Sequence, residues 1–157
     1  MLTTNVMRIL EKAGIKYEAR EYEYDENDLS GLHAAQALDL PAECVFKTLV
    51  ADGDNRQNFV FVIPVCEELD LKKCAGASGS KSVNLIHVKA LQPLTGYIRG
   101  GCSPIGMKKK LPTYIDETAL LQDRISVSAG HRGVQVLLSP SDLILTADAH
   151  PCDLIRY

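Results

Sequence analysis

Residues 45–65, VFKTLVADGDNRQNFVFVIPV, contain the pattern that decides the fold. Two apolar runs rich in β-branched residues, 45–51 and 58–65, flank the polar turn Asp52-Gly53-Asp54-Asn55. Glycine and asparagine tolerate positive φ angles, so this arrangement predicts a β-hairpin. Because the first run is apolar at successive positions, we expect it to be an inner strand that is covered on both faces.

Further helices and strands are predicted on both sides of this hairpin. Periodicity and capping residues predict helices over residues 3–13, 30–38 and 70–75, and Gly76 and Gly79 are expected to end the third. A further helix is predicted after Ser139-Pro140, with Leu143, Ile144 and Ala147 facing inward. Strands are predicted over residues 17–24, 97–99, 114–116, 125–128 and 134–138. No βαβ rhythm and no phosphate-binding glycine motif is present. The sequence predicts one α+β domain over residues 1–157, with a mixed, mostly antiparallel sheet and helices packed against it.

Composition excludes several classes of protein. The 157 residues are 46% apolar and 24% charged, which is typical of a globular chain and excludes a disordered or fibrous one. The longest apolar run, residues 59–65, is too short to cross a bilayer, and no secretory signal is present. The five cysteines are irregularly spaced and form no metal-ligand pattern with histidine. We therefore expect a soluble, cytoplasmic protein with reduced thiols, no metal and no membrane partner.

The charge is unevenly distributed along the chain. The stretch between Leu71 and Ile115 has no Asp or Glu and a net charge of +8, whereas the whole chain has −3. This asymmetry suggests that one surface meets a polyanion, unless acidic neighbours fold back and neutralise it. The pI of about 5.8 argues against binding duplex DNA. A short RNA end or a nucleotide phosphate fits better.

Lys47 is unusual because its surroundings in the sequence are apolar. An ammonium group in an inner strand is costly unless it is paired or opens into a cleft. Alternatively, Lys47 lies near a strand end and extends its ammonium to water. The residues alone leave both readings open.

Two glycine-rich segments are further candidates for chemistry. Gly100 and Gly101 could bring backbone N–H groups to a developing oxyanion, or form an ordinary turn before the basic run Lys108, Lys109 and Lys110. Residues 128–133 form a second turn, whose Ser128 and His131 make only a weak catalytic pair. Tyr22 and Tyr24 share a strand face, as a half-buried aromatic pair would.

Cys102 lies among cations that would lower the pKa of its thiol. No His or Asp is placed by the sequence to activate it as a nucleophile. A cysteine-nucleophile hydrolase is therefore a minor alternative.

Five segments together resemble the YbaK/EbsC family, in the same order and with similar spacing. They are residues 45–49 (VFKTL), 69–73 (LDLKK), 96–106 (GYIRGGCSPIG), 110–113 (KLPT) and 128–133 (SAGHRG). The family contains bacterial Cys-tRNA(Pro) deacylases and is related to the editing domain of prolyl-tRNA synthetase. The resemblance implies a free-standing editing enzyme for Cys-tRNA(Pro) that can also attack Cys-tRNA(Cys) and needs no cofactor. It also implies that the substrate thiol attacks its own ester and leaves as a cyclic thiolactone.

The resemblance implies roles for individual residues. Lys47, Gly100 and Gly101 match the catalytic positions, and the substrate-binding positions are Tyr22, Ser103, Pro104, Ser128 and Gly130. Arg99, Lys108, Lys109 and Lys110 are expected to contact tRNA, and prolyl-tRNA synthetase is expected as a partner. This chain departs from some relatives by carrying Gln135 where they have Asp. Editing of another mischarged tRNA such as Ala-tRNA(Pro), and a non-catalytic module that binds tRNA or a synthetase, remain as alternatives.

Overall fold

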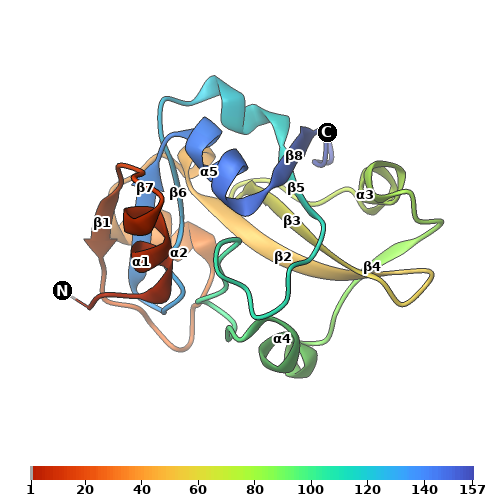
Figure 1. The fold of residues 1–157 in the computed structure, drawn as a ribbon, viewed down its shortest axis with the longest axis horizontal. Coiled ribbons are helices and arrows are strands. Elements are labelled where there is room, and N and C mark those ends of the chain that lie inside the picture. The colour runs from red at the N-terminus through yellow and green to blue at the C-terminus, as the bar shows by residue number, and fades with distance from the viewer. Residues whose placement is uncertain (1) are drawn as a thin grey trace.

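The predicted hairpin forms the centre of a five-stranded sheet in the computed structural model, which describes residues 2–157 (Figure 1). Strands β2 (Phe46–Gly53) and β3 (Asn58–Pro64) pair antiparallel. The sheet has the order β4-β2-β3-β5-β8, with β4 at Val83–Leu85, β5 at Thr113–Asp116 and β8 at Ala149–Cys152. The pairs β3–β5 and β5–β8 are parallel. β2 is therefore an inner strand, as predicted.

A second, three-stranded sheet lies beside the first and has the order β1-β7-β6 (Figure 1). Its antiparallel strands are β1 (Glu18–Glu21), β7 (Val134–Leu138) and β6 (Ile125–Ser128). One parallel bridge, between Val45 and Ser126, links the two sheets. The α+β class and the mostly antiparallel pairing are confirmed. The strands divide into two sheets rather than one because β6 meets the start of β2 only at this bridge.

Four of the five described α-helices follow a residue whose side chain accepts a backbone N–H, and the sequence predicts such a cap for the first and the last of these four. The helices are α1 (Asn5–Lys12), α2 (Gly31–Ala37), α3 (Leu71–Ser78), α4 (Val88–Thr95) and α5 (Pro140–Ala147). The capping residues of α1, α2, α3 and α5 are Thr4, Ser30, Asp70 and Ser139. Two short 3-10 helices, η1 (Ala42–Cys44) and η2 (Glu117–Leu121), complete the described elements.

The structure corrects several local predictions. The strand predicted over residues 17–24 is confined to Glu18–Glu21, so Tyr22 and Tyr24 lie beyond its end. α3 continues through Gly76 to Ser78 and ends only at Gly79, whose φ is +74°. Residues 97–99 form no strand, because α4 precedes them and ends at Gly96 in a left-handed conformation. α4 is absent from the sequence prediction because Pro93 interrupts its pattern, although the helix tolerates this proline in its last turns.

Both faces of the central sheet are covered, which explains why β3 is apolar at successive positions. Val60 and Val62 belong to a large core cluster that also includes Leu10 of α1 and Leu143 of α5. The intervening side chains of β3 belong to a smaller cluster on the opposite face. That cluster includes Phe59, Phe61, Ile63, Cys74 of α3 and Leu154 of the C-terminal segment.

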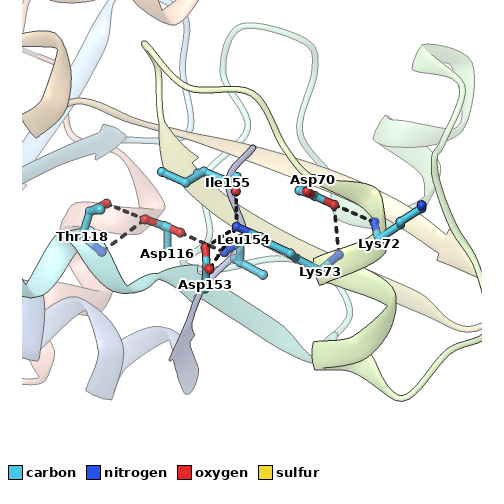
Figure 2. Close-up of polar contacts among 8 residues, drawn as sticks. All are labelled: Asp70, Lys72, Lys73, Asp116, Thr118, Asp153, Leu154 and Ile155. Atoms are coloured by element: carbon cyan, nitrogen blue, oxygen red, sulfur yellow. Dashed lines mark hydrogen bonds and ion pairs between the residues drawn. The ribbon is translucent and has the colours of Figure 1, made fainter. Parts of the chain in front are cut away.

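The C-terminal segment is fastened to this sheet by a buried carboxylate (Figure 2). Asp116 is fully buried, and its Oδ1 accepts from the backbone N–H of Leu154 over 2.9 Å. Its Oδ2 accepts from the N–H and the hydroxyl of Thr118. On either side of Leu154 in the sequence, Asp153 and the carbonyl of Ile155 accept hydrogen bonds from Lys73 Nζ. We refer to these contacts of Asp116, Thr118 and Leu154 as the C-terminal clasp.

In residues 2–157, no helix has the length and apolar character that a bilayer crossing requires.

Candidate active site

A pocket of about 610 Å³ opens between β2, the start of α2, the start of α4 and the loop at residues 99–102. The predicted site residues that line it are Tyr22, Lys47, Arg99, Gly100 and Ser128. These residues come from four separate parts of the chain, and the fold brings them to one cavity. Part of its rim is apolar, since Leu32, Leu85 and Val88 line it and remain at least half exposed. Leu85 and Val88 belong to β4 and α4, two elements that no pattern in the sequence predicts.

Lys47 is the second residue of β2, where its register partner is Ile63 of β3. It is partly buried, and its burial lowers the pKa of its ammonium, an effect that Cys66 and Glu68 partly oppose. Among residues 2–157, no carboxylate lies within ion-pair distance of its Nζ. The structure therefore supports the reading in which Lys47 opens into a cleft. An unpaired, partly desolvated ammonium is well suited to hold an anionic or strongly polar ligand group.

The two glycines of the loop have different environments. Gly100 lines the pocket with a φ of +86°, a conformation that residues with a Cβ rarely adopt. Gly101 is buried behind the wall, and its N–H donates to the carbonyl of Ile98 over 3.0 Å. A Cβ on Gly101 would lie only 3.1 Å from the backbone nitrogen of Arg132. Gly101 therefore allows the loop to pack against the turn at residues 131–132.

We expect Gly101→Ala to lower kcat about tenfold or more, because the loop must move away from this turn and carry Gly100 with it. The measurement is single-turnover deacylation of the substrate proposed below, with thermal unfolding measured in parallel. Gly76→Ala is the matched control, since a Cβ at that position meets no atom within 4 Å and the residue lies in α3. Equal rates for both variants would show that this packing does not set the loop position.

Three predicted substrate-binding residues, Ser103, Pro104 and Gly130, lie outside the pocket lining. Ser103 and Pro104 are buried, and Ser103 Oγ accepts from the N–H of Ile105. The N–H of Gly130 donates to Ser128 Oγ over 3.1 Å. In this structure the three residues support the turns that carry the lining residues.

A polar wall of the pocket is formed by Tyr22, Ser128 and Gln135. Burial raises the pKa of the Tyr22 hydroxyl, and the nearby polar groups of Gly133 and Gln135 oppose part of this rise. Tyr22 follows β1 and pairs through its N–H with the carbonyl of Gly133. The polar wall therefore depends on the pairing of β1 with β7 of the β6–β7 hairpin.

Cys102 also lines the pocket, but its thiol does not have the predicted acidity. Burial raises the pKa of Cys102 to about 12. The expectation that neighbouring cations lower this pKa is therefore wrong, because desolvation of the thiolate dominates. A thiol with this pKa is protonated at neutral pH and is a poor nucleophile.

The cations of the basic segment are only partly neutralised. Lys73 pairs with Asp153 and Lys110 with Asp148, each over 3.0 Å. For Arg99, Lys108 and Lys109, no carboxylate lies within 4 Å in residues 2–157. Arg99 is at the pocket, whereas Lys108, Lys109 and Lys110 are exposed and do not line it. Six of the eight cations of this stretch thus have no ion-pair partner in the described part of the chain.

Comparison with known proteins gives three related findings. The model of the family described as "Aminoacyl-tRNA editing domain" matches residues 31–145. A curated protein of Enterococcus faecalis (strain ATCC 700802 / V583), named "Putative Cys-tRNA(Pro)/Cys-tRNA(Cys) deacylase EbsC", is 48% identical over 141 residues, which cover 90% of this chain and 86% of that protein. Two solved structures share the fold. One, described as "a putative trans-editing enzyme for prolyl tRNA synthetase", has a TM-score of 0.83, 24% identity and full coverage of both chains. The other, "hypothetical protein APE2540", has a TM-score of 0.87 and 20% identity, and covers 96% of this chain and 99% of that one.

The matched residues 31–145 include α2, the hairpin of β2 and β3, the loop at residues 99–102 and the β6–β7 hairpin. Of the residues that line the pocket, Tyr22, Leu29 and Ser30 lie outside the matched range. The family resemblance seen in the sequence is thereby confirmed. The chain belongs to the aminoacyl-tRNA editing domain family.

Proposed function

We propose that this protein removes cysteine from mischarged Cys-tRNA(Pro), and that it also accepts Cys-tRNA(Cys). The observation that carries the proposal is a pocket in which an unpaired Lys47 lies together with Gly100, without any lining carboxylate. Such a pocket suits the negatively charged 3′ end of a tRNA. The 48% identical relative whose name includes both substrates supports this choice.

The proposed reaction uses the substrate's own thiol as the nucleophile. The cysteinyl sulfur attacks the ester carbonyl, and a C–S bond forms as a tetrahedral oxyanion develops. The oxyanion then collapses, the ester C–O bond breaks, and the thiol proton ends on the ribose oxygen of the released tRNA. The other product is the cyclic thiolactone of cysteine. The raised pKa of Cys102 supports a mechanism in which the protein supplies no cysteine nucleophile.

The protein's part in this reaction is to orient the ester and stabilise the oxyanion. We assign Lys47 to the terminal phosphate or ribose. Within residues 2–157, the N–H groups of Gly100 and Cys102 donate to no other group, so they are the available donors to the oxyanion. Gly101 was expected to contribute a donor as well, but its N–H is used by Ile98. Its proposed role is therefore to place Gly100.

Product analysis tests this proposal directly. Incubation with Cys-tRNA(Pro) is expected to release cysteine thiolactone, trapped and identified by mass spectrometry. Ser-tRNA(Pro), which carries a hydroxyl in place of the thiol, and Ala-tRNA(Pro), which carries neither, should remain intact. Release of alanine at a similar rate would instead support an editing enzyme without thiol chemistry, and binding without release of any amino acid would support a non-catalytic module.

We further propose that the exposed cations Lys108 and Lys109 contact the tRNA backbone. Lys109→Glu is expected to weaken tRNA binding several-fold at low salt and to lower the salt dependence of binding, since about one phosphate contact is lost. Lys12→Glu on α1 is the control with the same charge change. Fluorescence anisotropy with labelled tRNA(Pro) at several salt concentrations measures both properties. An equal effect of the two variants would mean that only net charge matters.

Prolyl-tRNA synthetase is proposed as the partner that delivers the mischarged tRNA. The support is the net charge of −3 of the whole chain, which gives little overall attraction for the body of a tRNA.

A further inference from the structure

The polar wall of the pocket contains a hydrogen-bonded pair to which no role has yet been assigned. Ser126 Oγ donates to Gln135 Oε1 over 2.7 Å. Ser126 is fully buried, and Gln135 is only 6% exposed. Gln135 lies opposite Ser128 in the β6–β7 register, and both line the pocket, whereas Ser126 lies outside the lining. The pair therefore joins the pocket surface to the interior.

This hydrogen bond decides which end of the amide is free. A buried hydroxyl proton needs an acceptor, and within residues 2–157 the only one in hydrogen-bond range of Ser126 Oγ is Gln135 Oε1. If Ser126 accepted from Nε2 instead, its own proton would be buried without a partner. Nε2 is thus the free end, and it can only donate.

The charges around the pocket limit which ligand groups can accept a hydrogen bond from Gln135 Nε2. The lining includes Lys47, His87 and Arg99, but no Asp or Glu. A ligand ammonium placed at Gln135 would face a donor and would find no carboxylate in the lining. A group with a free lone pair is required there.

We propose that Gln135 is a specificity-determining residue whose Nε2–H donates to an accepting atom of the aminoacyl group, and that Ser126 is the positioning residue that holds the amide in this orientation. The inference rests on the proposed function, since it concerns the same substrate. The accepting atom is the cysteinyl sulfur or the ester carbonyl oxygen, both of which carry lone pairs. A fixed donor of this kind disfavours substrates that cannot accept from it.

Gln135→Glu is the sharpest test, because it keeps an acceptor for Ser126 and replaces the donor by a carboxylate oxygen. At about pH 8, kcat/KM for Cys-tRNA(Pro) should fall about tenfold or more relative to wild type. The ratio of variant to wild type should recover as the pH falls through the titration of the new carboxyl group, because the protonated acid donates again. Lys47, His87, Arg99, Tyr22 and Cys102 face the pocket in both proteins, so their titration largely cancels in this ratio. An unchanged ratio at every pH would overturn the proposal.

The positioning role of Ser126 has its own variants. Ser126→Ala should lower kcat/KM several-fold without creating a new pH dependence, and Ser126→Thr, which keeps the hydroxyl, should restore most of the activity. If Gln135→Glu does not fold, Gln135→Met removes the donor with an uncharged side chain of similar length. Its loss of activity should be the same at every pH. Wild-type activity in Gln135→Met would overturn the proposal.

Binding measurements identify the accepting atom and separate this inference from the proposed function. The probes are stable amide analogues, adenosine with a 3′-cysteinylamino or a 3′-alanylamino group, titrated calorimetrically into wild type and Gln135→Met. Equal weakening of both analogues in the variant indicates the carbonyl oxygen, and weakening confined to the cysteinyl analogue indicates the sulfur. Unchanged affinity for both contradicts the inference. If wild type binds the analogues but does not deacylate Cys-tRNA(Pro), the proposed function fails while the role of Gln135 is still tested.

Discussion

Replacing Lys47 with methionine is expected to lower kcat/KM for Cys-tRNA(Pro) by about 10²–10³-fold, the effect of losing a preorganised electrostatic contact. The expectation follows from its place in the pocket and from the absence of an ion-pair partner in the described residues. Single-turnover deacylation measures the loss. Lys72→Met, an exposed position in α3 with the same charge change, is the control and should retain wild-type activity. A loss below about threefold in Lys47→Met would show that Lys47 only extends to water.

The same variant should be more stable than wild type, by about 1 kcal/mol, because an unpaired and partly desolvated charge is removed. The sign follows from the lowered pKa of Lys47. Between this lowered pKa and the ordinary value of 10.5, the unfolded state binds more protons, so wild-type stability from this group rises with pH in that window. The rise should be absent in Lys47→Met. Urea unfolding of both proteins at several alkaline pH values measures it.

Replacing Asp116 with alanine is expected to lower the free energy of unfolding by about 3 kcal/mol, because it leaves one buried and two partly buried donors without an acceptor. The donors are the N–H of Leu154 and the N–H and hydroxyl of Thr118, which the C-terminal clasp satisfies (Figure 2). In a chain of this length each kcal/mol corresponds to roughly 2–4 °C in Tm. Thermal and urea unfolding measure the change.

Asp153→Ala is the matched control for the clasp, because Asp153 is nearby and forms only a partly exposed ion pair with Lys73. Its loss should cost at most about 1 kcal/mol. Both variants should keep wild-type deacylation rates at a temperature where they are folded, since the clasp lines no part of the pocket. Equal destabilisation by the two substitutions would contradict the role assigned to Asp116.

The sequence patterns predicted the parts of the fold that depend on local chemistry. The hairpin of β2 and β3 follows from two apolar runs around a turn, and Thr4 and Ser139 cap helices as their side chains suggest. β4 and β8 were missed because they are short and largely exposed, and their pairing depends on distant partners. The division into two sheets was missed for a related reason. It depends on a single bridge between residues 45 and 126, which no local pattern contains.

In the candidate site, too, some residues are indicated by their local sequence and others only by the fold. Lys47 and the glycines attract notice in the sequence because each conflicts with its local context. The different environments of Gly100 and Gly101 could not be predicted, since they depend on the packing of Gly101 against Arg132. Cys102 was expected to be acidic from its charged neighbours in sequence, but the fold buries it. Ser126 was not noticed, because its partner Gln135 lies on the next strand.

Single-turnover deacylation of Cys-tRNA(Pro) and Ala-tRNA(Pro) by the wild-type protein tests the central claim most directly. With enzyme in excess, the account predicts rapid first-order loss of the cysteinyl ester and loss of the alanyl ester only at the rate without enzyme. If both esters disappear at similar enzyme-dependent rates, or if neither does while tRNA is bound, the claim of cysteine-specific editing is contradicted.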